Sequence, residues 1–164
     1  PRKNIDGLLS AYELYEERSD DPLPLVLAGP SNSVFASTDL RDSSNVHALG
    51  VVSEPKLTWL YENATLFVFP SYYEGFGLPI LEAMSVGTPV LTSDRGAMAE
   101  VSGNAAHLIN PEDEHEIAES IIMLLHSDEY TKSLQGAGKR RANQFTWEDT
   151  AQETLALYKE LIDS

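Results

Sequence analysis

The sequence contains no cysteine, which excludes disulfide bonds and thiolate metal sites and fits a reducing compartment such as the cytosol. It also has no uninterrupted apolar run near the roughly 18 residues that a membrane-spanning helix needs, and no signal peptide is visible. The four histidines show no i, i+4 pair of the kind that binds a metal on a helix. We therefore expect neither a metal site nor a transmembrane segment in this chain.

Positive charge is also scarce. The chain has 11 basic residues against 26 acidic ones, which gives a formal net charge of −15. Such a surface repels the phosphate backbone of DNA and RNA, so nucleic acid is not an expected partner. A small phosphate-bearing ligand would need a local positive site within these acidic surroundings.

Strand and helix patterns alternate along the 164 residues, which predicts one α/β domain built on a parallel sheet. Residues 31–45 carry no such pattern and are expected to form a loop. The last helix should carry an apolar stripe formed by Ala151, Leu155, Tyr158 and Ile162. The strands are expected at 23–28, 46–49, 64–69, 89–92 and 106–109, and the helices at 5–12, 54–61, 79–86, 98–101, 114–125 and 129–143 and from residue 147 onward.

A glycine-containing loop follows the third of these strands. The apolar stretch 64–69 is typical of a strand buried on both faces. Gly75 and Gly77 come next and permit close approach of the backbone to a ligand and a positive φ angle. Pro79 fits the first turn of the following helix. The free N–H groups at that helix start would bind an anion, with phosphate as the first candidate.

Two glutamates flank this loop. Glu74 directly precedes Gly-Phe-Gly, a context that favours a ligand site over a solvated loop carboxylate. Glu82 lies inside the helix and could be an ordinary exposed position. Its apolar neighbours on both sides predict instead a partly buried carboxylate, which would need donors such as ribose hydroxyls.

These motifs resemble those of a known family. The run EGFGLPILEAM at 74–84, with GTPV at 87–90, resembles the E-x7-E signature of retaining glycosyltransferases of family 4, which have the two-domain GT-B fold. The resemblance implies a Rossmann-like parallel sheet with helices on both faces, as in the C-terminal half of a GT-B fold. Residues 1–164 would then form a single nucleotide-sugar-binding domain that is truncated at its N-terminus. Further matching elements occur in family order: PRKN at 1–4, VHALGVV at 46–52, GAMAEV at 96–101 and FTWE at 145–148.

The resemblance assigns roles to individual residues. Glu74 would be the catalytic residue beside the donor sugar, and Glu82 would bind the ribose. Lys3 matches the family's phosphate clamp, whose arginine partner would precede Pro1. No metal and no cofactor is expected. The remaining donor-binding residues would be Gly50, Val51 and Val52 near the nucleotide base, and Gly75, Phe76, Gly77 and Leu78 in the glycine loop.

Glu54 has two interpretations of equal weight. A carboxylate at the start of the helix that opens near Pro55 gains about 0.3–1 kcal/mol from the helix dipole. Alternatively, a carboxylate just after Val52 could accept hydrogen bonds from guanine, which would favour GDP over UDP in the donor.

The resemblance implies that the full-length protein transfers a hexose from a nucleoside diphosphate sugar to a glycan or lipid acceptor, with mannose from GDP-mannose favoured. Acceptor recognition would belong to the missing N-terminal GT-B domain, so the isolated chain should be inactive. The protein would be cytoplasmic and could meet the cytosolic membrane face through that domain. The alternatives are a non-catalytic nucleotide-binding module, or another GT-B enzyme such as a nucleotide-sugar epimerase or a sugar phosphorylase. A phosphorylase would need a lysine placed for pyridoxal phosphate, and none is evident.

Overall fold

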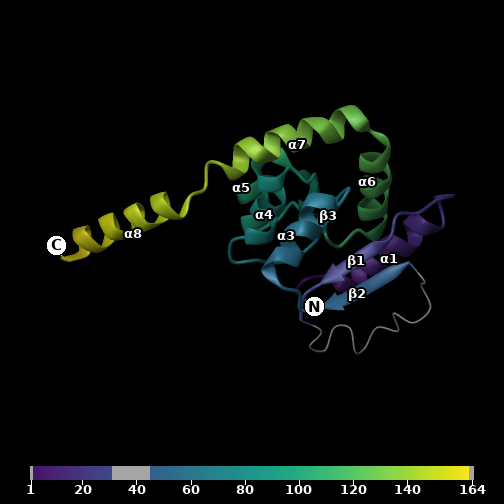
Figure 1. The fold of residues 1–164 in the computed structure, drawn as a ribbon, viewed down its shortest axis with the longest axis horizontal. Coiled ribbons are helices and arrows are strands. Elements are labelled where there is room, and N and C mark those ends of the chain that lie inside the picture. Colours follow the sequence, from purple (N-terminus) through teal and green to yellow (C-terminus); the bar gives the residue numbers. More distant parts are fainter. Residues whose placement is uncertain (1, 31–44, 163–164) are drawn as a thin grey trace.

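A computed structural model describes residues 2–30 and 45–162. The loop predicted at 31–45 therefore lies outside the described residues, except for Asn45. The elements follow one another in the expected alternation of strands and helices (Figure 1).

The strands pair only in parallel within the described part of the chain, as the alternating pattern predicts. They form two hydrogen-bonded ladders, β1-β2 and β3-β4-β5. Val68 of β3 packs against the same buried cluster, formed by Leu8, Leu9 and Leu27, as Leu25 and Val46 of the other ladder, so one apolar cluster joins the two. The strands are β1 (Leu25–Ala28), β2 (Val46–Gly50), β3 (Phe67–Phe69), β4 (Val90–Ser93) and β5 (His107–Ile109).

Helices cover both faces of the β3-β4-β5 ladder, and the burial of β4 shows this directly. All four residues of β4 are buried. Val90 packs into a cluster with α3, α4 and α5, whereas its neighbour Leu91 packs into a cluster with α1 and α6. Successive strand residues point to opposite faces, so each face has its own helical layer. The helices are α1 (Ile5–Glu16), α3 (Glu54–Asn63), α4 (Leu78–Val86), α5 (Gly96–Ser102), α6 (Glu114–His126), α7 (Asp128–Ala142) and α8 (Trp147–Ile162).

Several strands start later than predicted, and the largest difference concerns β3. The sequence predicts a strand buried on both faces over 64–69, but β3 begins only at Phe67. Phe67 and Val68 are half-buried and Phe69 alone is buried. Within the described residues β3 pairs with β4 on one side only, so its edge is less covered than that of β4. The strand buried throughout is β4.

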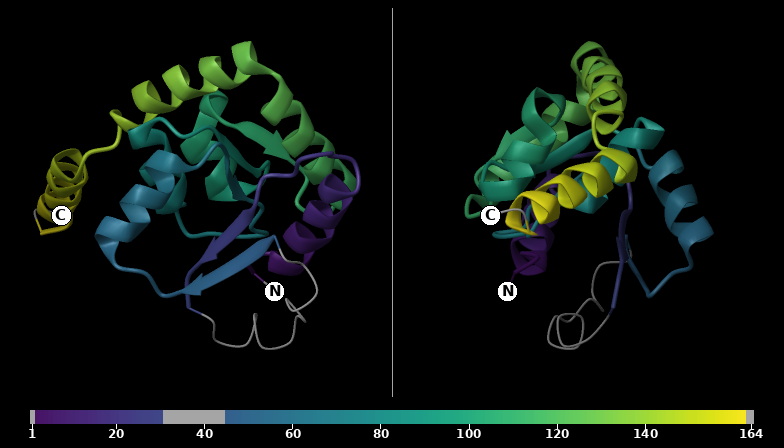
Figure 2. Two further views of the ribbon diagram at one scale, coloured as in Figure 1. Left: turned by 45° about the vertical axis from the view of Figure 1, so that its right-hand side comes forward. Right: turned by 90° about the vertical axis from the view of Figure 1, so that its left-hand side faces the viewer.

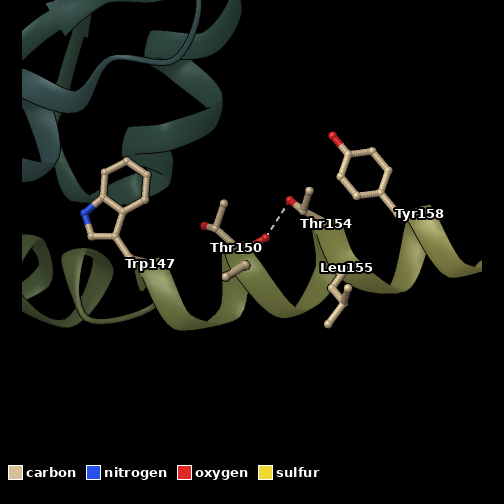
Figure 3. Close-up of a pocket in the computed structure, with 6 residues that line it drawn as sticks. Trp147, Thr150, Thr154, Leu155 and Tyr158 are labelled. Atoms are coloured by element: carbon tan, nitrogen blue, oxygen red, sulfur yellow. Dashed lines mark hydrogen bonds between the residues drawn. The ribbon is translucent and has the colours of Figure 1, made fainter.

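The last helix, α8, projects away from the rest of the molecule (Figures 1 and 2). None of its residues is buried. The predicted apolar stripe is present but uncovered, with Leu155 at 53%, Tyr158 at 59% and Ile162 at 82% exposure. A shallow hollow runs along this helix, and every residue that lines it belongs to α8 (Figure 3). It is therefore the open face of one helix and not an enclosed substrate pocket.

The packing of α4 against α7 gives a test of the core. Met84 of α4 is fully buried, and a Cβ added at Gly138 of α7 would lie 3.2 Å from its Cγ. We expect Met84→Ala to lower the free energy of unfolding by about 2–5 kcal/mol, because it removes buried methylenes and leaves a cavity. Urea denaturation would measure this loss. Met123→Ala on α6, where the side chain is 37% exposed, is the matched control and should change stability by under about 0.5 kcal/mol. Equal losses in the two variants would contradict this packing.

Candidate active site

Glu74 is held among three polar partners on the loop after β3. It is only 9% exposed, which excludes the interpretation as a solvated loop carboxylate. Its Oε1 atom lies 2.8 Å from Nζ of Lys3 and accepts a hydrogen bond from the Ser71 hydroxyl at 3.0 Å. Its Oε2 atom forms an ion pair with Nη1 of Arg2. Each carboxylate oxygen therefore has a cation of its own.

The N-terminal segment reaches this loop because several contacts hold it there. The backbone N–H of Tyr72 donates to the Arg2 carbonyl at 3.0 Å. Asn4 adopts a left-handed conformation at the start of α1, and its buried side chain donates to the Pro111 carbonyl at 2.6 Å. A Cβ at Gly7 would lie 2.5 Å from Oδ1 of Asn4, so only glycine leaves room for this side chain. The segment that carries Arg2 and Lys3 is thereby fixed at both ends.

The surroundings of Glu74 lower the pKa of its carboxyl group. Burial alone would raise this pKa, because it disfavours the charged form. The hydrogen bond and charge of Lys3, the hydrogen bond from Ser71 and the charge of Arg2 act in the opposite direction and prevail. Glu74 is therefore an ionised carboxylate at neutral pH, positioned by its partners and able to accept further hydrogen bonds.

Glu82 is not partly buried, contrary to the expectation. It is exposed on α4, although its neighbours Leu81 and Ala83 are buried. Consecutive residues of a helix lie about 100° apart, so flanking residues can face the core while the one between them faces outward. The Tyr61 hydroxyl donates to Oε2 of Glu82 at 3.1 Å. Burial and the charge of Glu82 raise the pKa of Tyr61, so its hydroxyl stays protonated and orients the carboxylate.

The glycine loop and the start of α4 match the sequence pattern in part. Gly77 has a φ of 103°, a conformation that L-residues with side chains rarely adopt, and no side chain caps the helix. Pro79 lies in the first turn, as predicted. Gly75 does not have a positive φ, and a Cβ added there would meet no atom within 4 Å. The need for glycine at position 75 therefore does not come from the packing of the chain itself.

Phe76 and Leu78 of this loop are both 44% exposed, so they offer apolar surface beside Glu74. The Phe76 ring meets Phe145 edge to face, with 5.9 Å between the ring centroids. Phe145 lies in the link between α7 and α8, and this contact connects the glycine loop to that link.

The residues after β2 are the second group that the sequence assigned to the donor site. Gly50 ends β2 with a φ of 65°, and Val51 is 78% exposed. Glu54 is the first residue of α3 and is exposed, so its roles as a helix-start charge and as a base-recognition group both stay predictions. The carboxyl ends of neighbouring parallel strands lie on one side of a sheet, which is the usual ligand side of open α/β folds.

Three residues of the site had no role assigned from the sequence. Arg2 stands beside Lys3 in the quoted motif, and Ser71 lies three positions before Glu74, so proximity in sequence could have indicated both. Tyr61 contacts Glu82 across 21 positions, and no local pattern indicates that pair.

No group of three or more metal-ligating side chains gathers in residues 2–30 and 45–162. In the same ranges, no helix combines the length and apolar character needed to cross a membrane.

Comparisons with known proteins agree with this fold and with the motifs. The family described as glycosyl transferases group 1 matches residues 1–141. O-antigen chain mannosyltransferase B of Escherichia coli is 39% identical over 97% of this chain and 43% of its own length. MMP alpha-(1->4)-mannosyltransferase of Mycolicibacterium hassiacum is 35% identical over 99% of this chain and 41% of its own length. The chain thus spans less than half the length of these curated relatives.

Solved structures give the same picture. Sucrose-phosphate synthase from Thermosynechococcus elongatus superposes with a TM-score of 0.81 at 28% identity, covering 99% of this chain and 43% of that one. The C-terminal domain of a glycosyl transferase group 1 family protein from Francisella tularensis has a TM-score of 0.75 over 87% of this chain and 79% of its own. At 19% identity, the second likeness shows the fold alone.

The lowered pKa of Glu74 predicts a pH dependence of stability. Because this pKa is lower in the folded chain than its ordinary value of 4.5, the ion pairs stabilise the fold above that value. Their contribution is lost as the pH falls through the lower folded pKa. The difference in free energy of unfolding between wild type and Glu74→Gln should therefore be largest near neutral pH and shrink below about pH 4.5.

Denaturant titrations over this pH range would measure that difference. Glu62→Gln, which removes an exposed carboxylate from α3, is the control and should give a much flatter difference. A Glu74→Gln difference that does not depend on pH would contradict the ion-pair arrangement.

Proposed function

The chain belongs to the glycosyl transferases group 1 family, and we propose that it forms the C-terminal, donor-binding domain of a retaining glycosyltransferase of family 4. One observation carries this proposal: Glu74 is a buried, ionised carboxylate held by two cations, directly before a glycine loop and an uncapped helix start. This places a carboxylate, positive charge and free helix N–H groups within one short stretch of structure. A nucleoside diphosphate sugar needs all three kinds of contact.

The donor would bind with its diphosphate at the start of α4 and near Lys3. Helix N–H groups and a cation stabilise a phosphate anion, and they are most effective where negative charge develops on the leaving group. The open space beside Gly75 gives the backbone room to approach this group. The chain's own positive groups would bind the diphosphate without a metal or cofactor.

The two glutamates would act on different parts of the donor. Glu82, exposed and oriented by Tyr61, would accept hydrogen bonds from the ribose hydroxyls. Glu74 would position the sugar and respond to positive charge at its anomeric carbon. Gly50, Val51 and Val52 would contact the base, and a carboxylate at Glu54 would suit guanine.

The donor proposed is GDP-mannose. Relatives at 39% and 35% identity are named mannosyltransferases, and a carboxylate at Glu54 beside the base would favour guanine over uracil. The acceptor would be a glycan, as the O-antigen name of one relative suggests, or a lipid-linked glycan at the cytosolic membrane face. The transferred group would be a hexose.

Transfer would also require a second GT-B domain that binds the acceptor. The curated relatives are more than twice as long as the stretch they share with this chain. The uncovered apolar stripe of α8 offers a surface for such a domain, because burying apolar area stabilises association. We propose that α8 contacts the remainder of the full-length protein.

We expect Glu74→Gln in the full-length protein to reduce mannose transfer from GDP-mannose by at least about tenfold, or about 1.4 kcal/mol of transition-state stabilisation. The amide keeps the size of the side chain but not the charge that responds to the anomeric centre. Product formation with labelled donor would measure the loss, with Glu62→Gln as a control that keeps wild-type turnover. Wild-type turnover in Glu74→Gln would contradict the catalytic role. Donor binding by the wild type without transfer or donor hydrolysis would favour a non-catalytic binding module instead.

A separate prediction concerns Glu82. We expect Glu82→Ala to weaken GDP binding by about 1.5–3 kcal/mol, the usual value of hydrogen bonds to a charged group. Tyr61→Phe keeps the ring but removes the hydroxyl that orients Glu82, so it should cause a smaller loss. Calorimetric titration with GDP would measure both variants, and Glu62→Ala is the exposed control. Unchanged affinity in Glu82→Ala would remove the ribose assignment.

A further inference from the structure

Arg2 and Lys3 contact the same carboxylate but are attached to the site in different ways. Nη1 of Arg2 pairs with Oε2 of Glu74 and also lies 3.5 Å from the Tyr73 carbonyl. The Arg2 carbonyl accepts the N–H of Tyr72 at 3.0 Å. Both the main chain and the side chain of Arg2 are therefore bound to residues 72–74. Arg2 and the Glu74 loop are joined as one unit.

Lys3 reaches Glu74 through its side chain. Its ammonium group lies 2.8 Å from Oε1 of Glu74 and 4.5 Å from the centroid of the Phe69 ring. The Glu74 oxygen that Lys3 contacts also accepts the Ser71 hydroxyl, so Oε1 keeps a partner if Lys3 moves. A lysine ammonium on a flexible four-carbon stem can turn from one anion to another more easily than an arginine fixed at several points.

The charge balance of this cluster also favours an exchange. Arg2 and Lys3 contribute two positive charges and Glu74 one negative charge, which leaves one positive charge in excess. The chain as a whole carries a net charge of −15, so this excess is a local exception. A local positive site attracts an anion even when the protein is acidic.

We propose that Arg2 is the positioning residue of Glu74 and that Lys3 is an exchangeable partner, which moves to the ligand when a nucleoside diphosphate binds. Arg2 and Ser71 then hold the carboxylate in place, while the position vacated by Lys3 on Oε1 becomes available to a sugar hydroxyl. This inference rests on the proposed function for the identity of the ligand. The part that concerns Arg2 and Glu74 rests on the contacts alone.

The inference predicts that loss of Lys3 lowers mainly the affinity for GDP, whereas loss of Arg2 lowers mainly the turnover. Lys3→Met should weaken GDP binding on the order of tenfold, as expected for loss of a charged hydrogen bond, with little change for guanosine. Arg2→Gln should change GDP affinity by less than about threefold and reduce turnover of the full-length protein on the order of tenfold. Arg2→Lys, which keeps the charge but not the planar fork, should recover part of the turnover. Arg18→Gln removes an arginine from an exposed ion pair with Glu119 and is the control.

The Arg2 assignment has a test that does not require transfer activity. Carboxyl carbon NMR on this chain would follow the titration of Glu74 in wild type, Arg2→Gln and Arg18→Gln. Removing the adjacent positive charge should move the Glu74 midpoint to higher pH in Arg2→Gln only. Thermal unfolding of each variant would separate this effect from a loss of folded protein.

Two results would overturn the inference. If Arg2→Gln and Lys3→Met lose GDP affinity equally, Arg2 is a phosphate ligand. If the midpoint of the Glu74 titration is unchanged in Arg2→Gln, Arg2 does not act on this carboxylate. The proposed function fails separately, if the wild-type full-length protein neither binds GDP nor transfers mannose.

Discussion

The site depends on the burial of one negative charge. A carboxylate taken out of water is costly unless cations and hydrogen-bond donors compensate it, and Glu74 obtains both from segments distant in sequence. This requirement draws residues 2 and 3 onto the loop that follows β3 and connects the start of α1 to the start of α4. The left-handed Asn4 and the adjacent Gly7 make that geometry possible. Fold and site are therefore linked through a single carboxylate.

The sequence predicted those features that depend on local pattern. Alternating strands and helices, the proline in the first turn of α4 and the positive φ of Gly77 all follow from residue types within a few positions. The resemblance to a glycosyltransferase family added the order of the motifs, and the family match supports it. The same local reasoning failed for Glu82, because two buried neighbours do not bury the residue between them on a helix.

Contacts between distant segments could not be predicted in this way. The pairing of Arg2 with Glu74 spans 72 positions and depends on how α1 packs beside β3. The apolar stripe of α8 was predicted from its spacing, yet spacing alone does not say what covers it. In the structure it stays open, while Phe145 at its base contacts Phe76 of the glycine loop. The position of α8 is therefore physically connected to the loop beside Glu74.

A structure of the full-length protein with GDP-mannose bound would test the central claim most directly. We predict that the diphosphate lies at the start of α4, the ribose at Glu82 and the sugar at Glu74. Lys3 should have moved from Glu74 to a phosphate oxygen, while Arg2 remains on the carboxylate. A donor bound away from the glycine loop, or a diphosphate bound there while Lys3 still contacts Glu74, would contradict the account.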